Sequence, residues 1–328
     1  MSRSAATSDR SFSWASAASE QGTAAWVQLN HPGRQSPRLL DRAPVAPSAV
    51  PMQGTWGAFA PPRALQPSEI EAIVAAFARA AGRVVRAGFG GVQIHAAHGY
   101  LVSQFLSPLT NTRSDGWGGG LEGRMRFLLE VVRATRAEVG PAVPVSVKLN
   151  TADFRPGGFD TDEAVEVAAA LERERIDLLE LSGGTYERSA MFDEARPSTR
   201  AREGMFLERA ERIRARVSTP LMVTGGFRTR EGMEAALDAG VDLIGLARPL
   251  AVEPDLAARL LSGQATGAAP VTVSVGVAAL DGLITGSWYQ VQLERLAAGR
   301  PADPNGSRWA AVARYVRDLV SPSGRAAR

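Results

Sequence analysis

The architecture of this chain is set by the stretch "GGVQIHAAHGYLVSQFLSP", residues 90–108, where a strand-like run ends in polar and aromatic residues. His95 and His98 are two of the three histidines among 328 residues, and Tyr100 follows two positions later. In α/β barrels the functional groups lie on the loops that follow the strands. We therefore expect strand 90–96 to belong to a parallel sheet and to carry a functional site at its end.

Short apolar runs alternate with helix-like stretches along the rest of the chain. Ser68 and Glu71 have the spacing of a capping box, which predicts that a helix begins at Ser68. Gly240 is placed to end the helix 230–239. The other predicted helices are 121–138, 162–174 and 205–217, and the predicted strands are 24–30, 90–96, 144–151, 176–184, 220–227 and 241–249.

Six strands with helices between most of them predict an α/β fold with a parallel sheet. Polar residues gathered at the strand ends favour a TIM (β/α)8-type barrel over an open sheet. A closed barrel has eight strands, so we expect an incomplete barrel in which the first two strands are missing and residues 1–23 form at most one helix. Residues 1–265 are the predicted barrel, and residues 266–328 a C-terminal helical tail that packs on the barrel or forms an interface.

The composition is that of a soluble globular protein, with 45% hydrophobic and 22% charged residues. No apolar run reaches the length of a membrane span, and the N-terminal residues lack the apolar core of a secretory signal, so we expect a cytoplasmic location. The formal net charge is only +3, without a basic block, which argues against nucleic acid as a partner. The absence of cysteine excludes disulfides, a thiol nucleophile and a thiolate-held iron–sulfur cluster. Whether the protein forms a homo-oligomer is left open.

Lys148 is the single lysine among 37 basic residues. In "VSVKLN" the alternation of a strand places Ser146, Lys148 and Asn150 on one face. Since a barrel strand turns one face to its helices and the other inward, Lys148 is expected to point inward at the functional end. Two alternatives stay open: a lysine that reaches solvent at the strand's exit, and the Schiff-base amine of a phosphate-binding isomerase or aldolase.

The same alternation turns Gln93 and His95 inward and leaves His98 and Tyr100 at the mouth of the barrel. These groups could act as general acid and base, hydrogen-bond a substrate oxygen, or bind a metal. A buried histidine pair without chemistry is a further alternative. We expect no metal, because a zinc site normally has three protein ligands and the chain has no cysteine.

Glycine turns follow the last two predicted strands, in "TGGF" and "GLAR". The backbone amides of Gly225, Gly226 and Ala247 and the side chain of Arg248 are suited to a phosphate group at the usual phosphate position of such barrels. On strand 24–30, the amide of Gln28 could pair with a ring that carries adjacent donor and acceptor atoms, or could satisfy buried backbone. Together these features indicate a phosphorylated heteroaromatic cofactor.

The motifs resemble those of the Old Yellow Enzyme family of FMN-dependent NADH:flavin oxidoreductases. The resemblance is carried by "VQLNHPGRQS" (27–36) and "IHAAHGYLVSQFLSPLTNTRSDGWGGGLEGRMRFL" (94–128). The segments "VKLN", "LELSGG", "MVTGGFRT" and "GVDLIGLARPL" follow in the family's order. It covers roughly residues 11–255, and its second motif is long and specific.

The resemblance implies FMN as cofactor and NADH or NADPH as reductant. Gln28 would pair with the pyrimidine edge of the flavin, and Lys148 would lie by its N1 and O2 atoms. Gly225, Gly226, Ala247 and Arg248 would hold the phosphate, with Ala247 standing where the family commonly has glycine.

The resemblance also implies the substrate, an electron-poor alkene such as an enone. His95 and His98 would hydrogen-bond its activating oxygen, and Tyr100 would deliver a proton to its α carbon as general acid. Substrate selectivity would come from loops such as 185–204. The alternative from another class is a truncated, non-catalytic relative that does not bind FMN stably.

Overall fold

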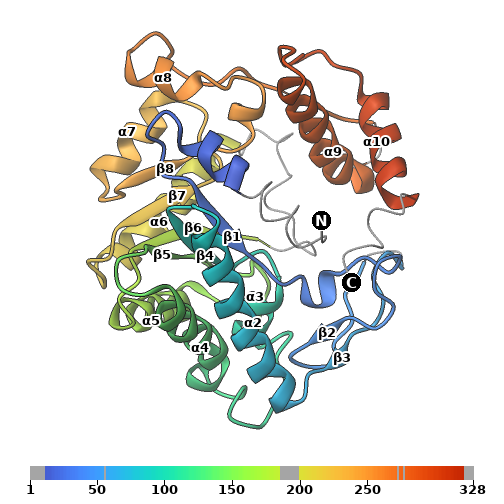
Figure 1. Cartoon of the computed structure of the whole chain (residues 1–328), viewed down its shortest axis with the longest axis vertical. Coiled ribbons are helices and arrows are strands. Elements are labelled where there is room, and N and C mark those ends of the chain that lie inside the picture. Colours follow the sequence, from blue (N-terminus) through green and yellow to red (C-terminus); the bar gives the residue numbers. More distant parts are fainter. Residues whose placement is uncertain (1–11, 55–56, 185–198, 272, 276–277, 321–328) are drawn as a thin grey trace. The chain divides into compact units, whose positions relative to one another are not determined.

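The computed structural model describes residues 12–54, 57–184, 199–271, 273–275 and 278–320, without the side chains of 199–206, 278–283 and 319–320. Strands and helices alternate along the chain (Figure 1). The chain forms two compact units. One consists of Met1–Arg188 with Arg212–Leu221, and the other of Ser189–Glu211 with Met222–Arg328.

The first unit is built on four parallel strands that pair in chain order. They are β1 (Trp26–Leu29), β4 (Gly91–Ala96), β5 (Val145–Asn150) and β6 (Leu178–Ser182). The interior strands are buried along nearly their whole length, as expected for a parallel sheet covered on both faces. The register places Gln28 opposite Gln93, and Lys148 between His95 and Glu180. This alignment brings the polar positions of neighbouring strands side by side.

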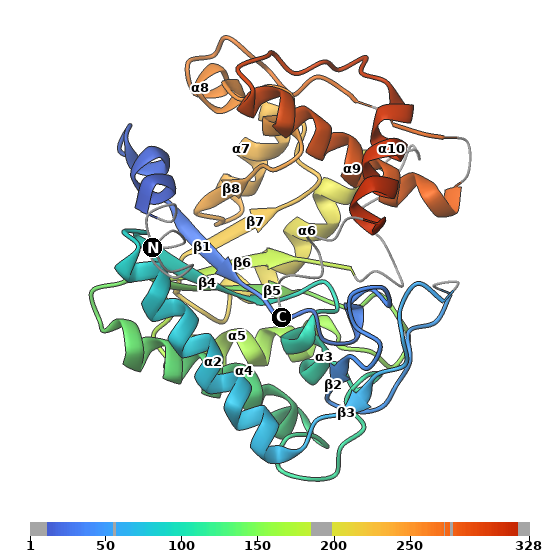
Figure 2. The ribbon, with the colours of Figure 1, turned by 45° about the vertical axis from the view of Figure 1, so that its right-hand side comes forward.

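Three helices lie along one side of this sheet: α2 (Pro67–Arg86), α4 (Leu121–Val139) and α5 (Thr161–Arg173) (Figure 2). The start of α2 differs from the prediction, since it begins at Pro67 and not at Ser68. The Glu69 carboxylate accepts a hydrogen bond from the Gln66 N–H at 2.9 Å, so the capping box is shifted by two residues. Proline is favoured at the first helical position because an N–H there would have no partner within the helix, so proline loses no hydrogen bond by lacking one.

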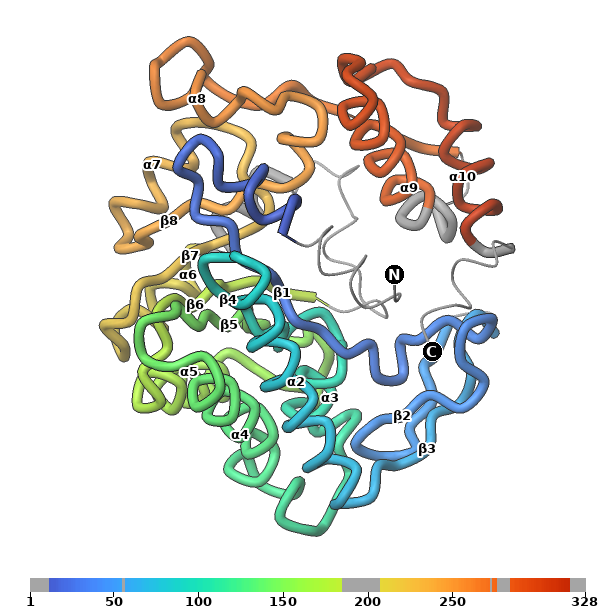
Figure 3. Tube along the Cα trace, viewed as in Figure 1, coloured from blue at the N-terminus to red at the C-terminus, as the bar shows by residue number. Residues whose placement is uncertain are grey.

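The long connection after β1 carries η1 (Gly33–Gln35), β2 (Val45–Ala46) and β3 (Arg63–Ala64), and can be followed in Figure 3. β2 and β3 form a separate parallel pair. Directly after β4 comes the short helix α3 (Leu101–Leu106). Phe105 of α3 stacks on Phe127 of α4 with ring centroids 4.3 Å apart, which fixes the segment that carries the histidines against the helical layer.

The second unit contains the parallel pair β7 (Leu221–Thr224) and β8 (Leu243–Gly245). α6 (Thr199–Arg214) and β7 span the boundary between the units. A small core of Val252, Ile284, Trp288 and Ala311 holds its C-terminal helices together, and the Trp288 indole N–H donates to Gly306 O at 3.0 Å. The remaining elements are α7 (Arg230–Asp238), η2 (Pro249–Ala251), α8 (Leu256–Leu261), α9 (Ala278–Ala297) and α10 (Arg308–Val320).

These elements confirm the α/β prediction and the C-terminal helical extension. The six predicted strands all occur, and those that pair within each unit are parallel and in chain order. The division into a barrel up to residue 265 and a tail stays a prediction, since the compact units divide the chain elsewhere. Among the described helices, none combines the length and the apolar character needed to cross a bilayer.

Candidate functional site

The turn after β4 holds its histidine in an unusual backbone conformation. His98 has φ 59° and is followed by Gly99 with φ 74°. The Asn150 side-chain oxygen accepts from the His98 N–H at 3.1 Å, and the Gln35 amide donates to the His98 carbonyl at 3.1 Å. A left-handed backbone is uncommon for residues other than glycine, so these bonds from β5 and η1 keep the turn in place.

The two imidazoles form a directional chain of hydrogen bonds. The Ala97 N–H can only donate, and it lies 3.2 Å from Nδ1 of His95, so the neutral His95 ring carries its proton on Nε2. His95 Nε2 lies 3.3 Å from His98 Nδ1, which must then accept. His98 Nε2–H therefore donates to Ser182 Oγ at 2.7 Å. Both imidazoles are thus assigned as Nε2–H tautomers.

Both imidazoles are buried, with His95 5% and His98 8% exposed. Burial, and next the nearby Lys148 ammonium, lower the pKa of His95 to about 3. Burial, His95 and Lys148 hold the pKa of His98 well below its usual range. The pair is therefore neutral near pH 7 and acts through N–H groups instead of positive charge.

Tyr100 lies beside this pair as the residue that precedes α3. Its ring packs edge to face against His95, with centroids 4.9 Å apart and planes at 70°. The side chain is partly exposed, in contrast to both histidines. The structure thus brings His95, His98 and Tyr100 together at the end of one strand, as the sequence predicted.

Lys148 points inward from β5 and pairs with Glu180 of β6. Lys148 Nζ lies 2.8 Å from Glu180 Oε1, and the two side chains are only 14% and 7% exposed. Breaking such a buried pair by removing one partner is costly, because the other charge is left without compensation. Next to the neutral histidines, the site therefore holds one positive and one negative charge.

The network continues from Glu180 to the edge strand through two amides. Gln93 Nε2 donates to Glu180 Oε2 at 2.8 Å, and Gln28 Nε2 donates to Gln93 Oε1 at 2.6 Å. Gln28 itself is exposed on β1. The structure thus connects Gln28 and Lys148, which are 120 positions apart in sequence, through Gln93 and Glu180.

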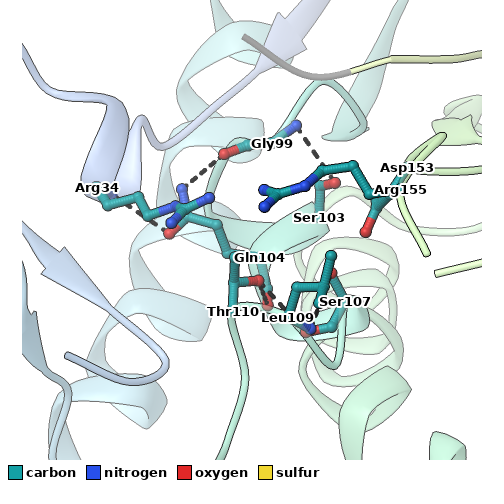
Figure 4. A pocket seen from close by; sticks show the side chains of 9 residues that line it. All are labelled: Arg34, Gly99, Ser103, Gln104, Ser107, Leu109, Thr110, Asp153 and Arg155. Carbon is teal, nitrogen blue, oxygen red and sulfur yellow. Dashed lines mark hydrogen bonds between the residues drawn. The ribbon is translucent and has the colours of Figure 1, made fainter. Parts of the chain in front are cut away.

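A small cavity, lined mostly by polar residues, borders Gly99 of the histidine turn (Figure 4). Gln104, 1% exposed, donates to Gly99 O at 2.7 Å and accepts from the Arg34 N–H at 3.3 Å, so it joins the turn to η1. A Cβ at Gly33 would collide with this amide, and Gly33 has φ 57°. Asp153 also lines the cavity, and burial raises the pKa of its carboxyl.

The predicted phosphate residues belong to the second unit. Gly225 and Gly226 have φ values of 109° and 88°, and a Cβ built on Gly225 would meet nothing within 4 Å. The turn thus offers open space above a backbone that only glycine adopts readily. Ala247 is exposed, and Arg248 is partly buried beside Arg228 around a small cavity.

Glu180 and Ser182 are the site residues that the sequence interpretation missed. They belong to the quoted motif "LELSGG", but no role was assigned to them. The signal was available: alternation in "LLELS" puts Leu179 and Leu181 on one face and Glu180 and Ser182 on the other. The same argument that turned Lys148 inward would have turned Glu180 toward it.

Two further points concern a metal site and the loop 185–204. No group of three or more histidine or acidic side chains able to hold a metal ion occurs in the part of the chain that is described. Of the loop 185–204, residues 185–198 lie outside the described residues, so its predicted part in selectivity stays a prediction.

Known proteins resemble this chain over most of its length. Residues 13–266 match the NADH:flavin oxidoreductase / NADH oxidase family. The NADH-dependent flavin oxidoreductase nadA of Aspergillus parasiticus is 42% identical over 264 residues, which cover 79% of this chain and 59% of that protein. The chain thus spans about three fifths of the length of this relative.

Solved structures of related enzymes are similar to this chain as well. A 2-naphthoyl-CoA reductase in complex with 2-naphthoyl-CoA superposes with a TM-score of 0.71 at 30% identity, over 78% of this chain and 40% of that one. Morphinone reductase in complex with tetrahydroNAD gives 0.62 at 30% identity, over 79% and 72%. These likenesses confirm the barrel-type fold class. With the family match over residues 13–266, they show that the chain belongs to the NADH:flavin oxidoreductase / NADH oxidase family, the Old Yellow Enzyme family that its motifs resemble.

Proposed function

We propose that this protein is an FMN-dependent oxidoreductase that takes reducing equivalents from NADH or NADPH and reduces an electron-poor alkene. The observation that carries the proposal is the gathering of His95, His98 and Tyr100 beside Lys148, on the sheet whose edge presents Gln28. Relatives named as NADH-dependent flavin oxidoreductases support it.

The side chains present fit FMN by their chemistry. Gln28 offers an exposed amide, which matches the alternating donors and acceptors of a pyrimidine edge. Lys148 would supply an ammonium to the flavin ring. Gly225, Gly226, Ala247 and Arg248 would supply backbone amides and a guanidinium for the phosphate. FMN would supply the hydride chemistry that no protein side chain provides.

His95 orients and polarises the substrate. Its Nε2–H now points to His98 Nδ1 over a long 3.3 Å contact, so a substrate oxygen can replace that weak acceptor. As a neutral donor in a dry site, His95 stabilises negative charge that develops on the oxygen during reduction. His98 assists by holding the His95 ring and, where its bond to Ser182 opens, by donating to the same oxygen.

Tyr100 supplies the proton. Its phenol can donate a proton to the substrate α carbon while the β carbon receives hydride, which makes Tyr100 the general acid. Its edge-to-face packing on His95 keeps the phenol close to the group that binds the oxygen.

A titration with FMN tests the proposal. Saturable quenching of FMN fluorescence by the purified chain is expected, with at least tenfold weaker binding in Gln28→Ala and Arg248→Ala. Gln290→Ala and Arg300→Ala remove the same side-chain types from exposed positions and serve as matched controls. Turnover with NADPH and a cyclic enone should follow.

The competing proposal is a non-catalytic relative. It predicts that soluble, folded protein leaves FMN fluorescence unchanged at any concentration tested. That result would overturn the enzymatic proposal for this chain.

A further inference from the structure

Glu180 is a buried carboxylate for which the proposed reaction has no direct use. It is 5% exposed, and its two oxygens are divided between Lys148 Nζ and Gln93 Nε2, each at 2.8 Å. Through Gln93 it is connected to Gln28, whose side chain reaches solvent at the sheet edge. Along this path two hydrogen bonds separate Glu180 from the Gln28 amide, and the bond from Gln28 to a ligand is the third.

The carboxylate fixes the orientation of both amides. An ionised carboxylate only accepts, so the Gln93 atom that faces it must be Nε2, and Gln93 Oε1 must face away. Gln93 Oε1 also only accepts, so the Gln28 atom that meets it at 2.6 Å must be Nε2. The orientation of both amides thus follows from the charge on Glu180.

We propose that Glu180 is a positioning residue that fixes, through Gln93, which atom of the Gln28 amide faces the bound flavin ring. Gln28 then presents Oε1, an acceptor, and keeps one N–H as a donor beside it. A ring N–H flanked by carbonyl groups, as in the pyrimidine edge of a flavin, satisfies both. The inference rests on the proposed function, because it assumes that Gln28 meets this edge.

A ring methylated at that nitrogen is the discriminating probe. N3-methyl-FMN carries a methyl group where FMN has a donor, so the wild-type protein should bind it at least tenfold more weakly than FMN. The dissociation constant of N3-methyl-FMN divided by that of FMN reports whether Gln28 presents its oxygen or its NH₂ to the ring. This ratio cancels changes in net charge, which affect both ligands alike.

Glu180→Gln should invert the chain of amides. The Lys148 ammonium only donates, so it takes the oxygen of the new amide and leaves its NH₂ to face Gln93. Gln93 then turns its oxygen toward residue 180 and its NH₂ toward Gln28, and Gln28 presents NH₂ to the ligand. The ratio of dissociation constants is expected to fall close to one.

Moving the carboxylate from position 180 to position 93, one step along the chain of hydrogen bonds, should restore the original orientation of the Gln28 amide. In the double variant Gln93→Glu with Glu180→Gln, Lys148 donates to the oxygen of the new amide at position 180. The NH₂ of that amide donates to the new carboxylate at position 93, and Gln28 Nε2 again donates to a carboxylate. The double variant has the wild-type composition and net charge. A return of the ratio to the wild-type value supports the relay, whereas a purely structural role of Glu180 predicts no return.

Glu130→Gln is the matched control, since it makes the same change on an exposed ion pair with Arg133. It should keep the wild-type ratio. An unchanged ratio in Glu180→Gln, or a folded double variant that still lacks discrimination, would overturn the proposal.

A second readout needs no flavin and separates this inference from the proposed function. In the ¹H–¹⁵N spectrum of the FMN-free protein, the Gln28 side-chain amide is assigned by its loss in Gln28→Ala. Its signals should move in Glu180→Gln and return in the double variant. If the wild-type protein binds no FMN but the signals behave in this way, the proposed function fails and the relay stands. If the signals stay in place in Glu180→Gln, the relay is wrong whether or not FMN binds.

Discussion

The Nε2 atom of His95 lies 3.3 Å from the Nδ1 atom of His98, and the two rings meet edge to face with centroids 5.0 Å apart. Two imidazoles can share such a contact only when at least one is unprotonated. Burial keeps both neutral, with the pKa of His95 lowered to about 3 and that of His98 well below its usual range. The stability of the first unit should therefore depend on pH.

The first prediction is a loss of stability as the pH falls from 7 to 5. In the unfolded chain His95 has a pKa near 6.5, whereas in the folded protein its pKa is about 3. Between these two pH values the unfolded state binds a proton that the folded state does not bind, which favours unfolding. The free energy of unfolding should drop by about 2 kcal/mol for each such histidine over this range. Urea unfolding at each pH measures it.

His95→Gln is the comparison that isolates the effect. It keeps a hydrogen-bonding side chain without a titrating ring, so its pH dependence should be shallower than that of the wild type. Asp153, whose pKa burial raises, has the opposite sign because its folded form gains a proton more readily. The difference between the two proteins removes this contribution. Parallel curves for the two proteins would contradict the buried neutral pair.

The second prediction concerns Ser182, the acceptor for His98. Ser182→Ala removes the oxygen that lies 2.7 Å from His98 Nε2 and leaves a buried N–H without this partner. The free energy of unfolding should fall by about 1–3 kcal/mol, the cost of an unsatisfied buried donor. Ser68→Ala is the matched control and should cost far less, since Ser68 is exposed and lies inside α2, after its cap. Equal losses in both variants would argue against the bond.

The sequence predicted the strands well because alternation and β-branched residues are local signals. It placed Lys148, Gln93 and His95 on the inner face for the same reason. It misplaced the start of α2, because Ser68–Glu71 and Gln66–Glu69 offer competing caps, and Pro67 decides between them. Local patterns are therefore reliable for faces and less so for boundaries.

Contacts between strands were harder to predict. That Lys148 meets Glu180 depends on the register of β5 against β6, which the covering helices and loops set together. That His98 turns to Ser182 depends on its left-handed backbone, which no residue type in "HAAHGY" dictates; glycine at position 99 only permits such a conformation. The pairing of the site residues is thus a property of the assembled sheet.

The third prediction concerns Arg124, which holds the end of α3 from inside α4. Its side chain is 5% exposed, forms an ion pair with Glu163 and donates to the carbonyls of Leu106 and Gly119. Lysine has one compact ammonium and cannot reach three partners at once. Arg124→Lys should lower the free energy of unfolding by about 2 kcal/mol, since Glu163 is partly exposed and keeps some hydration.

Arg133→Lys is the control on the same helix. Arg133 is half exposed and pairs with Glu130 and Glu174 at the surface, where ion pairs contribute little. Its unfolding free energy should change by less than about 0.5 kcal/mol. If Arg124→Lys lowered the free energy of unfolding equally little, the buried hydrogen bonds of Arg124 would not be what anchors α3.

The fourth prediction tests the proposed general acid. Tyr100→Phe removes the phenolic oxygen and keeps the ring that packs edge to face on His95 at 4.9 Å. Proton delivery by a positioned side chain contributes about 10²–10⁴-fold, so reduction of a cyclic enone should slow by that factor. The step in which NADPH reduces the bound flavin needs no proton from Tyr100 and should keep its rate within about twofold of the wild type. Anaerobic stopped-flow measurements of the two half-reactions separate these effects. A variant slowed equally in both half-reactions would point to a damaged flavin site, and one slowed in neither would remove Tyr100 from the mechanism.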